Sequence, residues 1–361
     1  MRQLRITQTQ AQAQTQERAH LRVFARTLSI LLCVAFIFFP GAMGAAVQLE
    51  PVDFEEDLAY ESLFKIAAAD FVGVDRDYLV ALGRNYLEHK AFVTVFNWSD
   101  HEWQVVWGSD NLLEEQSPIF MAVGSLHSSG EQGIVIMTNH RLYIYTYGEE
   151  GFVLSSHIYH TLLPQEINVA DINGDGIDEL LVVRVGEVQQ TYIDMVVEVY
   201  RLGNEGLVKL GSSPLMGNIR ALTGYDLDGD GRQEVLVETG VGSKPGVFSV
   251  LCWTSQDSLV EKYSVEGPLK TVPYGLDADF SLQPEQAGDC LITADSWGRV
   301  NILDFRDGEF RSVVEELRFN TALVGVAVGD FDGDGLSDLV VGGYPAKLIF
   351  LKNTVGEDGF L

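Results

Sequence analysis

Three short acidic segments carry the residues in this sequence that are best suited to chemistry. Each has an acid or amide at its first, third and fifth positions, another acid at its ninth, and glycine at its fourth and sixth. Carboxylate and amide oxygens are hard ligands, and calcium takes about six to eight of them in flexible geometry, including backbone carbonyls and water. The glycines permit the backbone turns that point these side chains inward. The pattern therefore predicts three calcium sites.

The expected ligands are the side chains at these positions and the backbone carbonyl of the seventh residue. They are Asp171, Asn173, Asp175 and Glu179 with the carbonyl of Ile177; Asp226, Asp228, Asp230 and Glu234 with the carbonyl of Arg232; and Asp330, Asp332, Asp334 and Asp338 with the carbonyl of Leu336. Carboxylates packed this closely repel one another unless a cation lies between them. A hydrated Asp-Gly turn would explain one such segment, but three with matched spacing favour calcium.

An EF-hand is the nearest alternative calcium motif. It requires a bidentate acid at position 12 of its loop and a helix on either side. Position 12 of the three segments is Val182, Val237 and Val341, and each valine lies in a β-rich run. The sequence therefore excludes the EF-hand and predicts strands on both sides of each acidic segment.

The spacing of the segments indicates a repeat. Asp171 and Asp226 are 55 residues apart, and Asp226 and Asp330 are 104 apart, which is close to two such intervals. A degenerate copy is therefore expected near Asp279 with a lengthened loop. Two more are expected near Ser125, where the acids are replaced, and near Asp70, where we expect a shortened loop. The six repeats are predicted to start near residues 63, 118, 165, 219, 271 and 322.

The strands within each repeat indicate the architecture. Each full interval holds four strand-like runs, and four strands in about 50 residues are typical of one propeller blade. The sequence thus predicts an all-β protein, a β-propeller of six four-stranded blades, with seven blades as the alternative. The last repeat lacks room for a fourth strand, which residues 47–57 can supply. We therefore expect the N- and C-terminal strands to close the ring and protect its edges.

The N-terminal 46 residues differ from the remainder. Five arginines precede an uncharged run whose apolar core is residues 28–39, and small residues follow. This layout is typical of a secretory signal peptide, predicted here as residues 1–46, with the propeller as residues 47–361. An uncleaved anchor is the alternative, although a membrane-spanning helix needs about 20 apolar residues. Secretion would leave Cys252 and Cys290, which either pair or, as we favour, are two buried thiols.

The composition limits the class of partner. The 361 residues include 52 acids against 24 lysines and arginines, which is a formal charge of −28. Such a chain is not attracted electrostatically to nucleic acid or to anionic lipid. We therefore expect no nucleic-acid partner, a membrane association only through an uncleaved N-terminal segment, and a monomer.

The repeated pattern Asp-x-(Asn/Asp)-Gly-Asp-Gly-x-x-(Asp/Glu) between strands resembles the FG-GAP / VCBS repeat family, which includes the calcium-binding blades of the integrin α-subunit propeller. The resemblance extends from about residue 63 to residue 361, with three specific loops and three weak ones. It implies a β-propeller, calcium between the first two strands of a blade, an extracytoplasmic location and a role in cell adhesion or ligand binding. Integrin propellers have seven blades, so this count differs from the six repeats.

No linear enzyme motif occurs in the chain: there is no Gly-x-Ser-x-Gly, His-Glu-x-x-His or phosphate loop. His157 and His160 should face opposite sides of a strand. Tyr143, Tyr145 and Tyr147 share one face, and blade packing is favoured over sugar stacking. The sequence thus predicts no enzyme but a secreted or cell-surface calcium-binding module for an extracellular protein or polysaccharide. A polysaccharide lyase or hydrolase, with acids gathered from several blades, is the alternative.

Overall fold

The computed structural model describes most of the chain after residue 48, and the account below concerns those residues. They are residues 49–52, 62–73, 76–85, 90–100, 102–110, 112, 119–127, 130–188, 193–240, 247–266, 273–280, 290–306, 309–344 and 346–354. The predicted signal peptide lies outside them. In this part of the chain we find no helix with the length and hydrophobicity that a membrane crossing requires.

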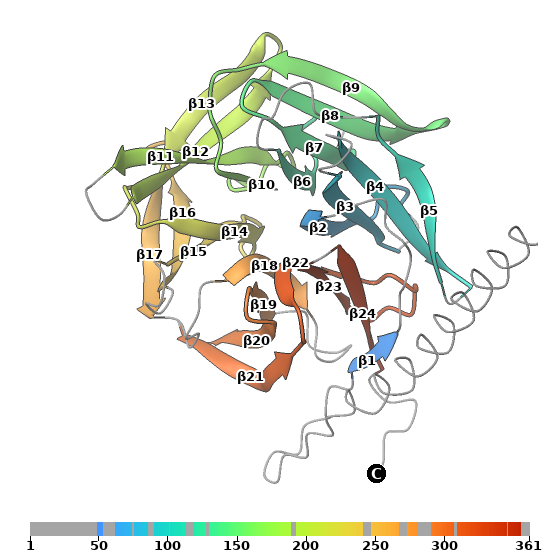
Figure 1. Cartoon of the computed structure of the whole chain (residues 1–361). Helices are drawn as coiled ribbons and strands as arrows, with labels where there is room; N and C mark the ends of the chain where they lie inside the picture. Colours follow the sequence, from blue (N-terminus) through green and yellow to red (C-terminus); the bar gives the residue numbers. More distant parts are fainter. Residues whose placement is uncertain are drawn as a thin grey trace, which may run out of the picture. The chain divides into compact units, whose positions relative to one another are not determined.

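Twenty-four strands form six four-stranded antiparallel sheets in the described residues, which contain no helix. Figure 1 shows the sheets as the blades of a ring, with the first strand of each blade innermost. The predicted all-β propeller is therefore confirmed, and it has six blades rather than seven.

Five blades are built from four consecutive strands, ordered from the centre outward. Blade 1 is β2 (Ser62–Ala69), β3 (Tyr78–Asn85), β4 (Lys90–Ser99) and β5 (Glu102–Gly108). Blade 2 is β6 (Phe120–Gly124), β7 (Gly133–Met137), β8 (Arg141–Gly148) and β9 (Gly151–Tyr159). Blade 3 is β10 (Glu166–Ala170), β11 (Glu179–Val188), β12 (Ile193–Gly203) and β13 (Gly206–Ser212). Blade 4 is β14 (Ile219–Tyr225), β15 (Glu234–Thr239), β16 (Val247–Thr254) and β17 (Ser258–Glu266). Blade 5 is β18 (Pro273–Phe280), β19 (Cys290–Asp295), β20 (Arg299–Arg306) and β21 (Glu309–Arg318).

The sixth blade joins the two ends of the propeller. Its inner strands are β22 (Ala322–Gly329), β23 (Asp338–Tyr344) and β24 (Lys347–Asn353), and its outermost strand is β1 (Leu49–Val52). β1 pairs antiparallel with β24, with Leu49 opposite Asn353. This confirms the expected closure by N- and C-terminal strands, which covers the outer edge of β24.

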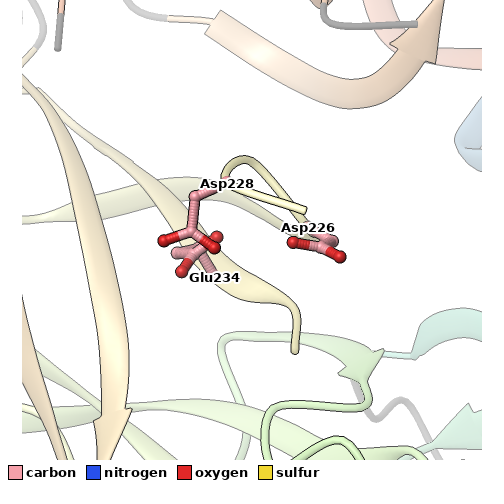
Figure 2. Close-up of side chains that lie close together, drawn as sticks. All are labelled: Asp226, Asp228 and Glu234. Carbon is pink, nitrogen blue, oxygen red and sulfur yellow. The ribbon is translucent and has the colours of Figure 1, made fainter. Parts of the chain in front are cut away.

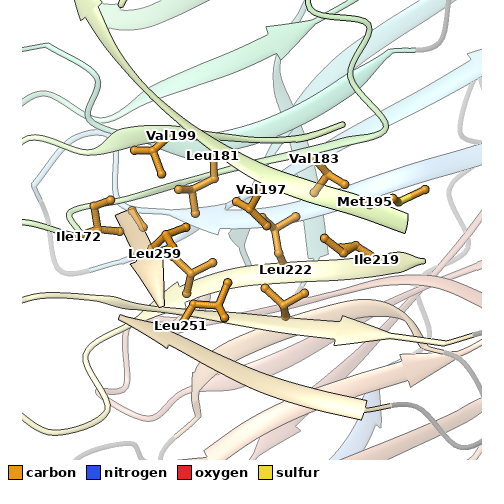
Figure 3. Packing of buried hydrophobic residues seen from close by; sticks show 13 residues of the cluster. Ile172, Leu181, Val183, Met195, Val197, Val199, Ile219, Leu222, Leu251 and Leu259 are labelled. Atoms are coloured by element: carbon orange, nitrogen blue, oxygen red, sulfur yellow. The ribbon is translucent and has the colours of Figure 1, made fainter. Parts of the chain in front are cut away.

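Packing between blades explains the long apolar runs in the second strands. In the described residues the buried apolar side chains form six clusters, and each cluster lies between two neighbouring blades. In β11, Leu181 and Val183 pack toward blade 4, whereas Leu180 and Val182 pack toward blade 2. Figure 3 shows the cluster between blades 3 and 4. Because alternate residues of a strand face opposite sides, a strand buried on both faces must be apolar throughout.

Aromatic rings reinforce the boundary between blades 6 and 1. The rings of Trp98 and Phe350 have centroids 4.8 Å apart, and those of Trp103 and Phe331 are 5.3 Å apart at a steep angle. Edge-to-face pairs of this kind add about 0.5–1.5 kcal/mol beyond the burial of their area. These aromatic contacts therefore help to stabilise the boundary that closes the ring.

Candidate metal loops

The three acidic segments connect the first and second strands of blades 3, 4 and 6, and we call them the blade 3 loop (residues 171–179), the blade 4 loop (226–234) and the blade 6 loop (330–338). Loop positions are counted from the first Asp. Loops of neighbouring blades share backbone hydrogen bonds, for example Gln233 N–H to the Asp171 carbonyl at 2.9 Å. The loops thus lie at one end of the propeller, here called the loop end.

The Asp at position 1 folds each loop around its own carboxylate. In the blade 3 loop, Asp171 Oδ1 accepts the N–H groups of Gly174 (2.8 Å) and Asp175 (3.1 Å), and Oδ2 accepts that of Gly176 (2.7 Å). Gly174 and Gly176 have φ of 75° and 81°, a region that favours glycine. Asp226 and Asp330 accept the same three N–H groups in their own loops at 2.7–3.1 Å. The turn is therefore formed by the polypeptide itself.

The acid at position 9 is buried at the start of the second strand in all three loops. Glu179 and Asp338 have no exposed surface, and Glu234 is 5% exposed. Burial raises the pKa of all three carboxyl groups, that of Asp338 to about 8. Among the described residues, Glu179 Oε2 and Asp338 Oδ2 have no hydrogen-bond partner. Because a buried polar atom without a partner is costly, these oxygens are suited to coordinating a cation.

Two of the loops gather three acids around one point. In the described residues the carboxylates of Asp226, Asp228 and Glu234 have oxygens within 4.8 Å of one another (Figure 2). Those of Asp330, Asp332 and Asp338 are grouped in the same way. These are positions 1, 3 and 9, so both sets suit a divalent metal ion.

Among the remaining predicted ligands, Asn173 and the acids at position 5 are not part of these three-acid groups. Position 3 of the blade 3 loop is Asn173, whose amide Nδ2 donates to Glu179 Oε1 at 2.6 Å. At position 5, Asp175, Asp230 and Asp334 each accept the N–H of the residue two positions on, at 2.9–3.1 Å. The second carboxylate oxygen of Asp175 accepts a hydrogen bond from Arg201 Nη2 at 2.8 Å, and that of Asp334 lies 3.1 Å from Lys352 Nζ. The carbonyls of Ile177, Arg232 and Leu336 remain predicted ligands.

Each loop also has a basic side chain that the sequence analysis missed. Arg201 in β12 bonds to Glu179 and to Asp175, the latter at 2.8 Å. Lys262 in β17 bonds to Asp228 at 2.8 Å and lowers the pKa of that carboxyl group. Lys352 in β24 bonds to Asp332 and approaches Asp334 at 3.1 Å. These cations partly neutralise the acids, so a metal ion must share the carboxylates with them or displace them.

Cys252 takes the place of a basic residue in blade 4. Cys252 follows Leu251, which pairs with Val235 on the neighbouring strand β15. In blade 3, Arg201 follows Tyr200, which pairs with Leu180 on β11. Cys252 and Arg201 therefore occupy equivalent positions on the third strand. The Cys252 Sγ donates to Glu234 Oε1 at 3.6 Å. Burial raises the pKa of this thiol to about 11, so it is protonated at neutral pH. No disulfide joins Cys252 and Cys290, in agreement with the favoured interpretation of two thiols, although Cys252 is only partly buried.

The weak repeat of blade 1 keeps the turn and, of the acids at positions 1, 3, 5 and 9, only Asp70 at position 1. In blade 1, β2 ends at Ala69 and β3 begins at Tyr78, the same spacing as from Ala170 to Glu179 in blade 3. The expected shortened loop is therefore wrong: the length is kept, and Asp70 Oδ1 accepts the Val72 and Gly73 N–H groups. The lengthened loop of blade 5, residues 281–289, lies outside the described residues.

The other candidate side chains have separate surroundings. The His157 ring stacks on Tyr143 at 4.8 Å, whereas His160 Nδ1 accepts the Leu162 N–H. Tyr143 and Tyr145 belong to the cluster between blades 1 and 2, as the packing interpretation predicts. The two histidines therefore do not form a joint metal site.

Comparison with known proteins bears on the last of the three loops. Residues 323–357 match the family model described as FG-GAP repeat, and this segment contains the whole blade 6 loop. The match is consistent with assigning the chain to the FG-GAP repeat family. No curated protein matches the chain.

Proposed function

From this FG-GAP assignment and the six-bladed fold, we propose that the chain is a secreted or cell-surface binding module whose loops hold calcium. FG-GAP propellers are generally binding or adhesion modules. The observation that carries the calcium proposal is the pair of buried, unpartnered oxygens on Glu179 and Asp338, each within an acidic loop. Calcium would satisfy these oxygens and cancel the repulsion among the acids.

The proposed role of calcium is structural. A ligand that binds only the folded state stabilises it by about 2.7 kcal/mol at 100 times its dissociation constant. The positions 1, 3 and 9 that would hold the ion come from the end of one strand, the loop and the start of the next. Calcium would therefore stiffen the loop end without taking part in a reaction.

Thermal unfolding with EDTA and with millimolar calcium tests this role. Segment 47–361, which forms one compact unit, is compared with the double variant Asp228→Asn, Glu234→Gln. The double variant Glu205→Gln, Asp257→Asn, in the exposed turns between β12 and β13 and between β16 and β17, is the matched control for charge. Calcium should raise the Tm of the wild type and the control by several degrees and that of the Asp228→Asn, Glu234→Gln variant by less. Equal Tm values with and without calcium in the wild type would reject the calcium proposal.

The opposite end of the propeller offers the surface for a partner. Strands alternate in direction, so the turns between second and third strands and the links between blades lie at this end. Trp297 (76% exposed), Tyr344 (56%) and Tyr159 (70%) are there, and Arg141 lies 5.1 Å above the Tyr159 ring. Large exposed aromatic residues are typical of contact surfaces. We call this surface the aromatic end and propose that the extracellular partner binds to it.

Binding to an array of purified polysaccharides tests the aromatic end. The double variant Trp297→Ala, Tyr344→Ala should lose the binding that the wild type shows. Val105→Ala, an exposed residue on the outer strand β5, should keep it. The same wells are assayed for new reducing ends or unsaturated uronates. Cleavage would support the enzyme alternative, and no binding to any polysaccharide would leave a protein as the partner.

A further inference from the structure

A pair of hydrogen bonds between neighbouring blades recurs at the loop end. Gln233, at position 8 of the blade 4 loop, donates its N–H to the Asp171 carbonyl at 2.9 Å. The Asp171 N–H in turn donates to Gln233 Oε1 at 3.1 Å. Both backbone polar groups of the first residue in the blade 3 loop are thus held by the following blade.

The same reciprocal pair occurs at two other boundaries in the described residues. Asp77 of blade 1 holds Asp330 of blade 6, with both hydrogen bonds at 2.8 Å. Asp178 of blade 3 holds Ser125 of blade 2, at 2.8 and 2.6 Å. The acceptor is an amide at one boundary and a carboxylate at two, and the residue held is Asp or Ser. The arrangement therefore belongs to the blade boundary and does not depend on metal ligands.

An arginine reinforces this arrangement where the ring closes. Arg76, at position 7 of the blade 1 loop, donates from NH2 to the Asp332 carbonyl of blade 6 at 2.8 Å. A Cβ added at Gly333 would lie 3.0 Å from the Arg76 guanidinium. Arg232 occupies the same loop position in blade 4, and its Cγ lies 3.1 Å from a Cβ built on Gly174. Glycine at position 4 thus also lets the next blade approach closely.

We infer that the residue at position 8 is an inter-blade clamp that positions the first metal ligand of the preceding blade. Asp330 organises its loop through three N–H groups, so fixing its backbone fixes the loop relative to blade 1. Asp77 and Arg76 are then positioning residues for a metal that they do not touch. The clamp couples the blade 6 loop to the boundary at which the ring closes. This inference rests on the proposed calcium function.

Calcium titration of the full-length protein tests the clamp, with calcium alone as the ligand and calorimetry as the readout. Asp77→Ala and Asp77→Asn remove the same charge, but only Asn keeps an oxygen that can accept the Asp330 N–H. Loss of one hydrogen bond with an unsatisfied partner should weaken one calcium site of Asp77→Ala by about tenfold. Asp77→Asn should stay within about threefold of the wild type. In EDTA, the Tm of Asp77→Ala should lie below that of Asp77→Asn.

The outcomes separate the clamp from the calcium proposal. If the wild type binds calcium and both variants bind it equally well, the positioning role is overturned while the calcium function stands. If the wild type itself takes up no calcium, the proposed function fails, and this is visible without any variant. Should Asp77→Ala not fold, Gln233→Ala replaces it, because it removes the equivalent side-chain acceptor at position 8 of the blade 4 loop, which holds the Asp171 N–H. Gln233→Ala with wild-type affinity would also overturn the inference.

Discussion

Glu238 permits a quantitative prediction about the effect of pH on stability. It lies near the end of β15 with no exposed surface, and neither carboxylate oxygen has a hydrogen-bond partner in the described residues. Leu236, two residues earlier and so on the same face of the strand, packs toward blade 5. Burial, and secondarily the charge of Asp295 in blade 5, raises the pKa of Glu238 from 4.5 to about 9. The folded protein therefore holds this carboxyl group in its neutral form at pH 7.

The direction of the pH effect on stability follows from the number of protons that the folded and unfolded chains bind. Between pH 4.5 and 9 the unfolded chain releases the Glu238 proton while the folded chain keeps it, so unfolding is favoured as the pH rises. Each pH unit in this window is worth ~1.4 kcal/mol. The free energy of unfolding therefore loses about 4 kcal/mol from this group by pH 7.5 and about 6 kcal/mol by pH 9, to an order of magnitude.

The Glu238→Gln variant removes this titration and keeps the shape of the side chain. Urea unfolding is measured from pH 5 to pH 8.5 for the wild type, for Glu238→Gln and for Glu150→Gln, an exposed control in the turn between β8 and β9. The advantage of Glu238→Gln over the wild type should be small at pH 5 and grow by about 3–4 kcal/mol toward pH 8. The control should follow the wild type. A difference that does not change with pH would refute a buried, protonated Glu238.

Two further perturbations have clear expected results. Removing residues 47–57 deletes β1 and exposes the edge of β24. This deletion should lower the Tm and produce oligomers that size-exclusion chromatography detects. An unchanged monomer would contradict the closing role of β1. Lys352→Met removes the cation bound to Asp332 and should tighten calcium binding severalfold in calorimetry. The control Lys347→Met, on the same strand, should leave the affinity unchanged. Weaker binding in Lys352→Met would show that the lysine supports the site rather than competing with the ion.

The fold could be predicted because its main constraint is local in sequence. A second strand buried between two blades must be apolar on both faces, so runs such as Leu180–Val183 recur at the blade interval. The missing strand of blade 6 followed from counting four strands to a blade, and β1 supplies it. The acids at positions 1, 3 and 9 were found because each set lies within nine consecutive residues.

The features that were missed depend on pairing between distant segments. Arg201 and Lys352 reach the acids from a neighbouring strand, so their role depends on the strand register, which sequence spacing does not specify. Asp77 and Asp330 are 253 residues apart. The blade 1 loop appeared shortened because the acids at positions 3, 5 and 9 are absent, although its turn and its clamp are intact. In the sequence, the clamp could have been found only by comparing the residues at position 8 of every repeat.

The contacts within the loops explain why the three predicted sites are not equivalent. Each loop is folded by its own first Asp, so a metal ion adds to a structure that already exists, and its affinity depends on what competes for the acids. In blade 3, Arg201 bonds to both Asp175 and the buried Glu179, which makes it the hardest cation to displace. In blade 4, Lys262 reaches only Asp228 from the outermost strand and is 39% exposed. Since a surface ion pair contributes only about 0–1 kcal/mol, we expect the blade 4 loop to bind calcium first and the blade 3 loop last.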